Sequence, residues 1–164
     1  MKMETNTTDT KTEEAAKNRS LQAYMVAADA VMAGIFTGEG GVIEFAPITR
    51  TGEPYFCSLY TVTQVEKINE ANRLSLEVVR TAAPLLFVNA ETTAEEILKK
   101  GNLERGLDEQ YTEPALLSFI QSVLTQTKKA WEDIRSIAGV LIRSDEATED
   151  ILDFSVCRAK ESVI

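Results

Sequence analysis

Histidine is absent from this chain of 164 residues, and its only two cysteines, Cys57 and Cys157, lie far apart in the sequence. A chain without histidine cannot build a Ser-His-Asp triad, a Cys-His pair or the common zinc and iron sites that use imidazole. The cysteine spacing favours reduced thiols, although strand-like segments around both leave a bridge between them open. We therefore expect a protein that is not an enzyme and that binds no cofactor and no metal.

Basic residues are also few, because 17 Lys and Arg stand against 26 Asp and Glu and leave a formal net charge of −9. Binding to nucleic acid needs clustered basic side chains, so this charge argues against a nucleic-acid partner. The first twenty residues contain no apolar segment, and no uninterrupted apolar run approaches the roughly 18 residues of a membrane span. The sequence thus predicts a cytoplasmic protein with no membrane partner.

The N-terminal segment is polar and rich in Thr, Glu, Lys and Asn, with little apolar surface to bury. We expect residues 1–19 to be a disordered tail and residues 20–164 to form a single domain. Ser20 has the side chain of an N-cap, and apolar residues recur at helical spacing from Leu21 onward. Gly38 follows as the expected C-terminal cap of this first helix.

Two β-rich runs, residues 41–48 and 54–62, are separated by the turn-like segment TRTGE. A short link that contains glycine between such runs predicts a β-hairpin. Near the C-terminus, residues 151–157 alternate apolar and polar side chains and are expected to return and pair with this hairpin.

Capping-box patterns mark further helices. Thr63 with Glu66 predicts a helix that runs to about residue 80 and is stopped by Pro84, and Thr93 with Glu96 predicts a short helix that ends at residue 101. The apolar run 85–88 between them fits either a strand or the end of the first of these helices.

A long apolar stripe begins after a cap at Thr112 and extends to Arg143, with a possible interruption at Gly139. As one helix it would be roughly 45 Å long. Its apolar residues recur at steps of four and three, and a second row at steps of seven widens the apolar face beyond a simple coiled-coil seam. Such a face suits either a packed core or a subunit interface, and the spacing does not distinguish the two.

These elements predict an α+β fold: a helix-dominated single domain in which helices cover a small antiparallel sheet made by the hairpin and the C-terminal strand. The long helix over 112–143 is expected to form the spine of the core or of a homo-oligomer.

The hairpin is the candidate ligand site, because Arg50, Glu53, Tyr55 and Tyr60 place a planar donor, an acid and aromatic hydroxyls on adjacent strands. The alternative is that the tyrosines pack on helices and that the turn is solvated. Acidic residues between 145 and 153 lack the spacing of a calcium loop and are read as a solvated linker.

The function expected from these features is that of a non-catalytic protein-protein interaction or assembly protein, of a kind found among accessory proteins of viruses or mobile elements. Its partners would be itself, as a homo-oligomer, and another protein. The expected interface residues lie on the long helix: Leu116, Ile120, Leu124, Trp131, Ile134 and Ile137. The alternative is a module that binds a polar or anionic small molecule, and the third is a histidine-free enzyme centred on Cys57 or on the acidic linker.

Overall fold

The computed structural model describes the backbone of residues 2–38, 41–46, 55–59, 62–101, 112–143 and 150–154. Its helices are α1 (Lys2–Thr37), α2 (Val62–Lys67), α3 (Glu70–Val88), α4 (Ala94–Gly101), α5 (Glu113–Lys129) and α6 (Trp131–Arg143). Its strands are β1 (Gly41–Ala46), β2 (Tyr55–Leu59) and β3 (Asp150–Phe154).

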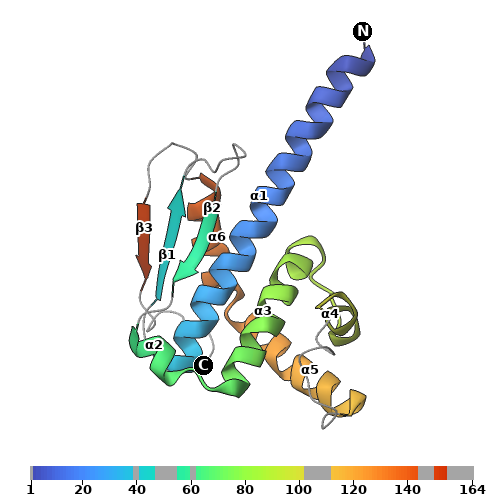
Figure 1. Ribbon diagram of the computed structural model, residues 1–164. Helices are drawn as coiled ribbons and strands as arrows, with labels where there is room; N and C mark the ends of the chain where they lie inside the picture. Colours follow the sequence, from blue (N-terminus) through green and yellow to red (C-terminus); the bar gives the residue numbers. More distant parts are fainter. Residues whose placement is uncertain are drawn as a thin grey trace.

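Helix α1 is the central element of the molecule (Figure 1). It contacts α3 and α6 along much of its second half, and also α2, β1 and β2, while its N-terminal end projects beyond the other elements. The contact surface is built from small side chains, since alanines on α1 meet a core that also contains alanines of α3 and α6. These fully or almost fully buried alanines are Ala23, Ala27, Ala28, Ala30, Ala33, Ala82, Ala83 and Ala138. Because small side chains let helix axes approach closely, α1 can be surrounded on several sides.

The strands pair through their backbones in the order β2-β1-β3, with both pairs antiparallel. In this register Phe45 of β1 stands opposite Phe56 of β2 and opposite Asp150 of β3. The strands lie beside α1, on the side away from α3 (Figure 1).

The core is helical, and the expected α+β class is therefore wrong. In the ranges where side chains are described, 90% of residues are helical and none belongs to a strand. The buried apolar residues described there all lie on α1, α3, α4, α5 and α6 or at the α5–α6 junction. The sequence analysis assigned the core to helices packed on a sheet, whereas the helices bury their apolar faces against one another. The spine is α1 rather than the helix predicted over 112–143.

The start of α1 differs from the prediction. The Ser20 hydroxyl donates a hydrogen bond to the Ala16 carbonyl at 3.1 Å, as a serine inside a helix does, so the predicted N-cap at this residue is wrong. The predicted end is confirmed: Gly38 has a φ of 76°, and its N–H donates to the Gly34 carbonyl at 2.8 Å. The division into a tail over 1–19 and a domain over 20–164 stays a prediction.

The predicted long helix is interrupted at Ala130, not at Gly139. Ala130 has φ −90° and ψ 4°, and its N–H donates to the Gln126 carbonyl as the C-cap of α5. Its own carbonyl accepts from the N–H of Ile134, which starts the hydrogen bonding of α6. The charges around the junction match two helix ends, with Lys128 and Lys129 closing α5 and Glu132 and Asp133 opening α6. The predicted cap at Thr112 is confirmed, since its hydroxyl accepts from the Ala115 N–H at 3.3 Å.

The helix predicted from Thr63 is also divided. Asn69 caps α3, because its side-chain oxygen accepts from the N–H of Asn72 at 2.8 Å, so α2 and α3 are separate helices. Helix α3 continues through Pro84, which therefore does not stop it, and residues 85–88 form its last turn rather than a strand. Proline removes one amide donor, but the buried residues Ala82, Ala83 and Leu86 hold this part of α3 in the core. The cap at Thr93 is confirmed by a hydrogen bond from the N–H of Glu96 at 3.3 Å.

Truncation of a core side chain tests this packing. Ile120 is fully buried on α5, so we expect Ile120→Ala to lower the free energy of unfolding by about 2–5 kcal/mol, through lost burial and the cavity left behind. Val65→Ala, at a side chain that is 52% exposed, is the control and should change it by less than about 0.5 kcal/mol. Urea unfolding followed by circular dichroism measures both values, and equal losses would contradict the assignment of Ile120 to the core.

Candidate functional site

The predicted ligand residues of the hairpin are only partly covered by the structure. Tyr55 is placed by its backbone in β2, opposite Ala46 of β1, whereas Arg50, Glu53 and Tyr60 lie outside the described residues. Cys57 likewise is placed by its backbone, opposite Glu44, and Cys157 lies outside the described residues. The hairpin ligand site and the cysteine bridge therefore stay predictions.

The six predicted interface residues divide into two groups. Those covered inside a single chain are Leu116, Ile120, Leu124 and Ile134, none of which is more than 5% exposed. Trp131 and Ile137 are half-buried at the edge of the core. The width of the apolar stripe is thus largely explained by contacts within the chain, and Trp131 and Ile137 are the two members that stay partly exposed.

Trp131 belongs to a stack of three aromatic rings that joins three helices. Its ring lies 5.3 Å from the ring of Tyr24 on α1, centre to centre, and Tyr24 in turn lies 4.5 Å from Phe87 on α3. Tyr24 is buried, but Phe87 is 40% exposed and its neighbour Val88 is 61% exposed. We call these four residues, Tyr24, Phe87, Val88 and Trp131, the aromatic patch. Sequence analysis did not name Phe87 and Val88 as site residues, because it left the run 85–88 open between a strand and the end of the helix before it.

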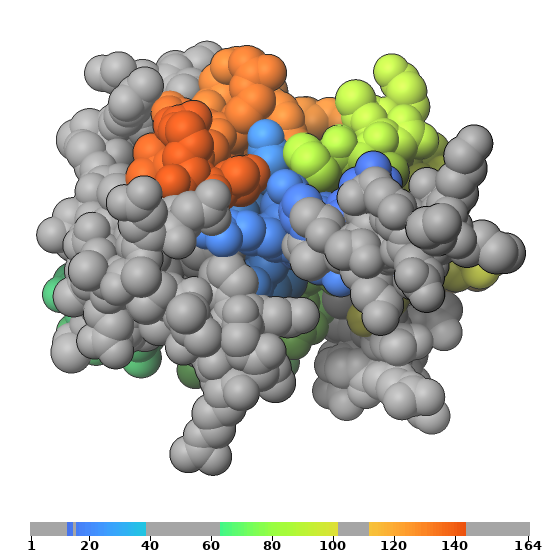
Figure 2. Space-filling model, turned by 90° about the horizontal axis from the view of Figure 1, so that it is seen from above, coloured from blue at the N-terminus to red at the C-terminus, as the bar shows by residue number. Residues whose placement is uncertain are grey.

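Helix α1 lies between the two sides of this patch. Figure 2 shows α1 in blue, flanked by the α5–α6 region in orange and by the end of α3 in yellow-green. Beside Trp131, the Glu132 carboxylate accepts two hydrogen bonds from Arg135 Nη2, at 2.6 and 2.8 Å. Burial raises the pKa of the Tyr24 hydroxyl; Arg135 opposes this shift and Glu132 adds to it.

A second surface feature is a pocket of about 340 Å³ along the first half of α3. The described lining consists of Val65 on α2, Ile68 in the link, and four residues of α3: Arg73, Leu76, Glu77 and Arg80. The α3 residues are spaced at three, four and seven positions, which places them on one face of the helix. This volume falls near the lower end of the range for small-molecule sites, roughly 300–1,000 Å³.

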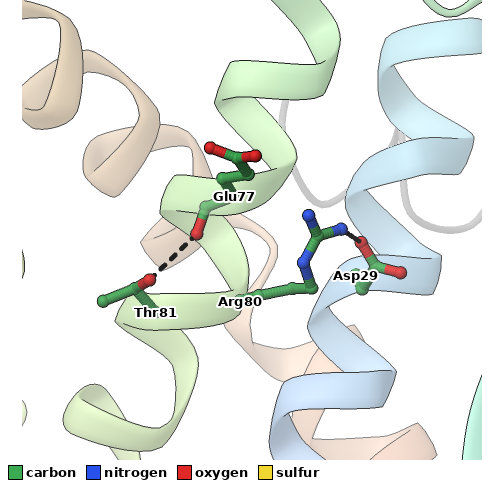
Figure 3. Close-up of polar contacts among 4 residues, drawn as sticks. All are labelled: Asp29, Glu77, Arg80 and Thr81. Atoms are coloured by element: carbon green, nitrogen blue, oxygen red, sulfur yellow. Dashed lines mark hydrogen bonds and ion pairs between the residues drawn. The ribbon is translucent and has the colours of Figure 1, made fainter. Parts of the chain in front are cut away.

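One wall of the pocket is held to α1 by an ion pair. Arg80 Nη1 donates to Asp29 Oδ1 at 3.0 Å, and Figure 3 shows the Arg80 side chain reaching from α3 to Asp29 while the Glu77 carboxylate lies apart from this pair. The Asp29 side chain is 7% exposed and that of Arg80 is 39% exposed. Arg80 therefore serves both the packing of α1 on α3 and the lining of the pocket.

Within the described ranges, no three His, Cys, Asp or Glu residues are placed to hold a metal ion. The segment Ala16–Thr37 is long and apolar enough to cross a membrane by length and composition, which the sequence analysis overlooked. In the structure 67% of this segment's most apolar stretch is buried, and both the buried core helix of a soluble protein and an N-terminal signal sequence have this length and composition. The predicted cytoplasmic location is untested by these observations.

No protein-family model matches this chain, and neither a curated protein nor a solved structure is significantly similar to it. Function must therefore be argued from the aromatic patch and the pocket themselves.

The ion pair between α1 and α3 predicts an asymmetric response to substitution. Arg80→Met leaves a buried carboxylate without its guanidinium and should lower the free energy of unfolding by more than about 1 kcal/mol. Asp29→Asn removes the buried charge and should lower the free energy of unfolding by less than Arg80→Met does. The double variant should be more stable than Arg80→Met alone, because the unpaired carboxylate is gone. Arg80 is partly exposed and Asp29 has a further interaction, so the loss should fall below the ~3–5 kcal/mol typical of fully buried pairs. Urea unfolding measures all three; strictly additive costs would contradict the coupling.

The raised pKa of Tyr24 predicts an alkaline loss of stability. The folded state favours the neutral hydroxyl, so this contribution is complete below the ordinary tyrosine pKa of 10.0 and is lost as the pH rises through the raised value. Stability should therefore fall above about pH 10 more steeply in the intact chain than in Tyr24→Phe. Urea unfolding at neutral and alkaline pH tests this, since the other tyrosines are common to both proteins. Identical slopes would contradict the assignment.

Proposed function

We propose that this chain is a non-catalytic assembly protein that associates with a second copy of itself through the aromatic patch. The observation that carries this proposal is the exposure of Phe87 and Val88 at the end of a ring stack anchored in the core. No catalytic residue is assigned in this proposal.

The aromatic patch has the composition and rigidity of a binding hot spot. Aromatic side chains bury a large area at a small cost in side-chain entropy, and hot spots are enriched in Trp and Tyr. Here Tyr24, Phe87 and Trp131 are already ordered by stacking on one another. A partner would therefore bury exposed apolar surface without having to order the rings first.

The charges bordering the patch favour a second copy as the occupant. Lys128 and Lys129 are exposed just before Trp131 in the chain, where Glu132 is already paired with Arg135, whereas Glu91 is exposed three positions after Val88, which follows Phe87 at the other end of the stack. A two-fold axis passing near Tyr24 would place the basic border of one copy against the acidic border of the other. The same surface can then meet itself with opposite charges in register, although the chain as a whole carries a net charge of −9.

The oligomeric state tests this proposal. Light scattering on a size-exclusion column, over a range of protein concentrations, should show the intact chain approaching twice its 18.1 kDa mass. Phe87→Asp and Val88→Asp should both shift the mass towards the monomer. Val88→Asp, at a side chain that is 61% exposed and outside the ring stack, should do so with unchanged helical circular dichroism. Val65→Asp is the matched control, an exposed aliphatic residue outside the patch, and should associate as the intact chain does.

Exchanging the charges of the two borders distinguishes a two-fold dimer of defined geometry from non-specific association of apolar surfaces. Lys129→Glu should weaken the dimer, and adding Glu91→Lys should restore it, because the two borders meet across the two-fold axis. A monomer at every concentration, or a dimer that is insensitive to Phe87→Asp, would refute the proposal.

A further inference from the structure

The pocket along α3 is lined by charges of both signs. Arg80 is paired with Asp29 at 3.0 Å, which largely balances its charge. Arg73 and Glu77 are exposed on the same face, and neither forms a side-chain ion pair with any residue that the structure describes. The order along the helix, a base four residues before an acid, is the less favourable one for a pair within a helix. One positive and one negative group thus remain available to a ligand.

The rest of the lining is apolar. Val65, Ile68 and Leu76 come from α2, the link and α3, so the apolar part is formed where the two helices meet. Val65 is 52% exposed, although an aliphatic side chain gains by leaving water. A ligand with an aliphatic body would cover it.

We infer that this pocket binds a small zwitterion with an aliphatic body, that is, a free aliphatic α-amino acid. The ligand carboxylate would accept hydrogen bonds from the guanidinium groups of Arg73 and Arg80, because the planar guanidinium group matches the two oxygens of a carboxylate. The ligand ammonium would pair with the Glu77 carboxylate. The aliphatic side chain would lie on the apolar lining.

A ligand of zero net charge agrees with the electrostatics better than an anion does. Counting Asp29, the groups at the pocket are two guanidinium groups and two carboxylates, so an anion would gain little overall attraction. The carboxylate and the ammonium of a zwitterion pair with Arg73 and Glu77 at the same time, so neither side chain is covered by the ligand without an opposite charge beside it.

Arg80 is a ligand-binding group that Asp29 holds in place before a ligand binds. Its link to Asp29 joins α3 to the central helix and limits the movement of its guanidinium, so less side-chain entropy is lost when a ligand binds. The site is separate from the aromatic patch. The patch residues on α3, Phe87 and Val88, lie seven and eight positions after Arg80, about two helical turns further along α3. It also differs from the hairpin residues expected to bind a ligand.

Isothermal titration calorimetry of the full chain with L-leucine tests the inference, with three analogues that each lack one feature. The probes are 4-methylpentanoate without the ammonium, 3-methylbutylamine without the carboxylate, and glycine without the body. We expect saturable heat with leucine and at least about tenfold weaker binding of each analogue, as expected when a charged hydrogen bond or the apolar contact is lost.

Variants of exposed residues locate the binding. Arg73→Gln and Glu77→Gln should each weaken leucine binding by about tenfold or more, whereas Arg143→Gln and Glu95→Gln, at exposed residues outside the pocket and outside the aromatic patch, should not. The inference is overturned by an absence of leucine binding, by analogues that bind as well as leucine, or by equal affinity in the pocket and control variants. The thermal unfolding temperature of each variant, measured without ligand, separates a loss of binding from a loss of folding.

Discussion

Helix α1 packs closely against α3 and α6, and the positions of the outer helices follow from this packing. Buried alanines of α1 share one core with buried alanines of α3 and α6, and in a close-packed core a larger side chain forces neighbouring groups to move. Two residues of α1 make specific contacts with neighbouring helices. Asp29 pairs with Arg80, and Tyr24 stacks on the rings of Phe87 and Trp131. Both depend on the distance between helix axes, so α1 sets the geometry of the pocket wall and of the aromatic patch together.

The interruption at Ala130 explains why Trp131 lies where it does. A continuous helix over 112–143 would carry its apolar stripe straight along one axis, but α5 packs on α3 and α4 whereas α6 packs on α1. Trp131 opens α6 and stacks on Tyr24 at the point where the chain changes direction. The buried Ala130, with no bulk beyond its methyl group, fits the space where the helix ends meet.

Helix α3 links the two surface features. Its first half lines the pocket, and its last turn carries the exposed part of the aromatic patch. Occupation of the pocket and association of two copies would therefore act on one rigid element, held to α1 by the Asp29–Arg80 pair and by the Tyr24–Phe87 stack. The two surfaces differ in chemistry, because one is mixed in charge and concave and the other is aromatic.

Local features could be predicted from the sequence: the caps at Thr93, Thr112 and Gly38, and the apolar faces of the helices, because these depend on residues within a few positions of one another. The breaks at Asn69 and Ala130 were also predictable from the sequence. Asn69 is a residue type favoured at helix N-caps. Around Ala130, two lysines followed by two acidic residues are typical of one helix ending and another beginning. Which helix faces pack against each other depends on contacts between residues far apart in the chain, and these are seen in the folded structure alone. Apolar spacing predicts that Ile134 is buried, but not that its helix, α6, packs on α1. In the same way, the alternation over 41–62 predicts strands but does not show that the core consists of helices. The same holds for the aromatic patch and the pocket, which bring together residues from distant elements whose contacts arise from packing and leave no local pattern.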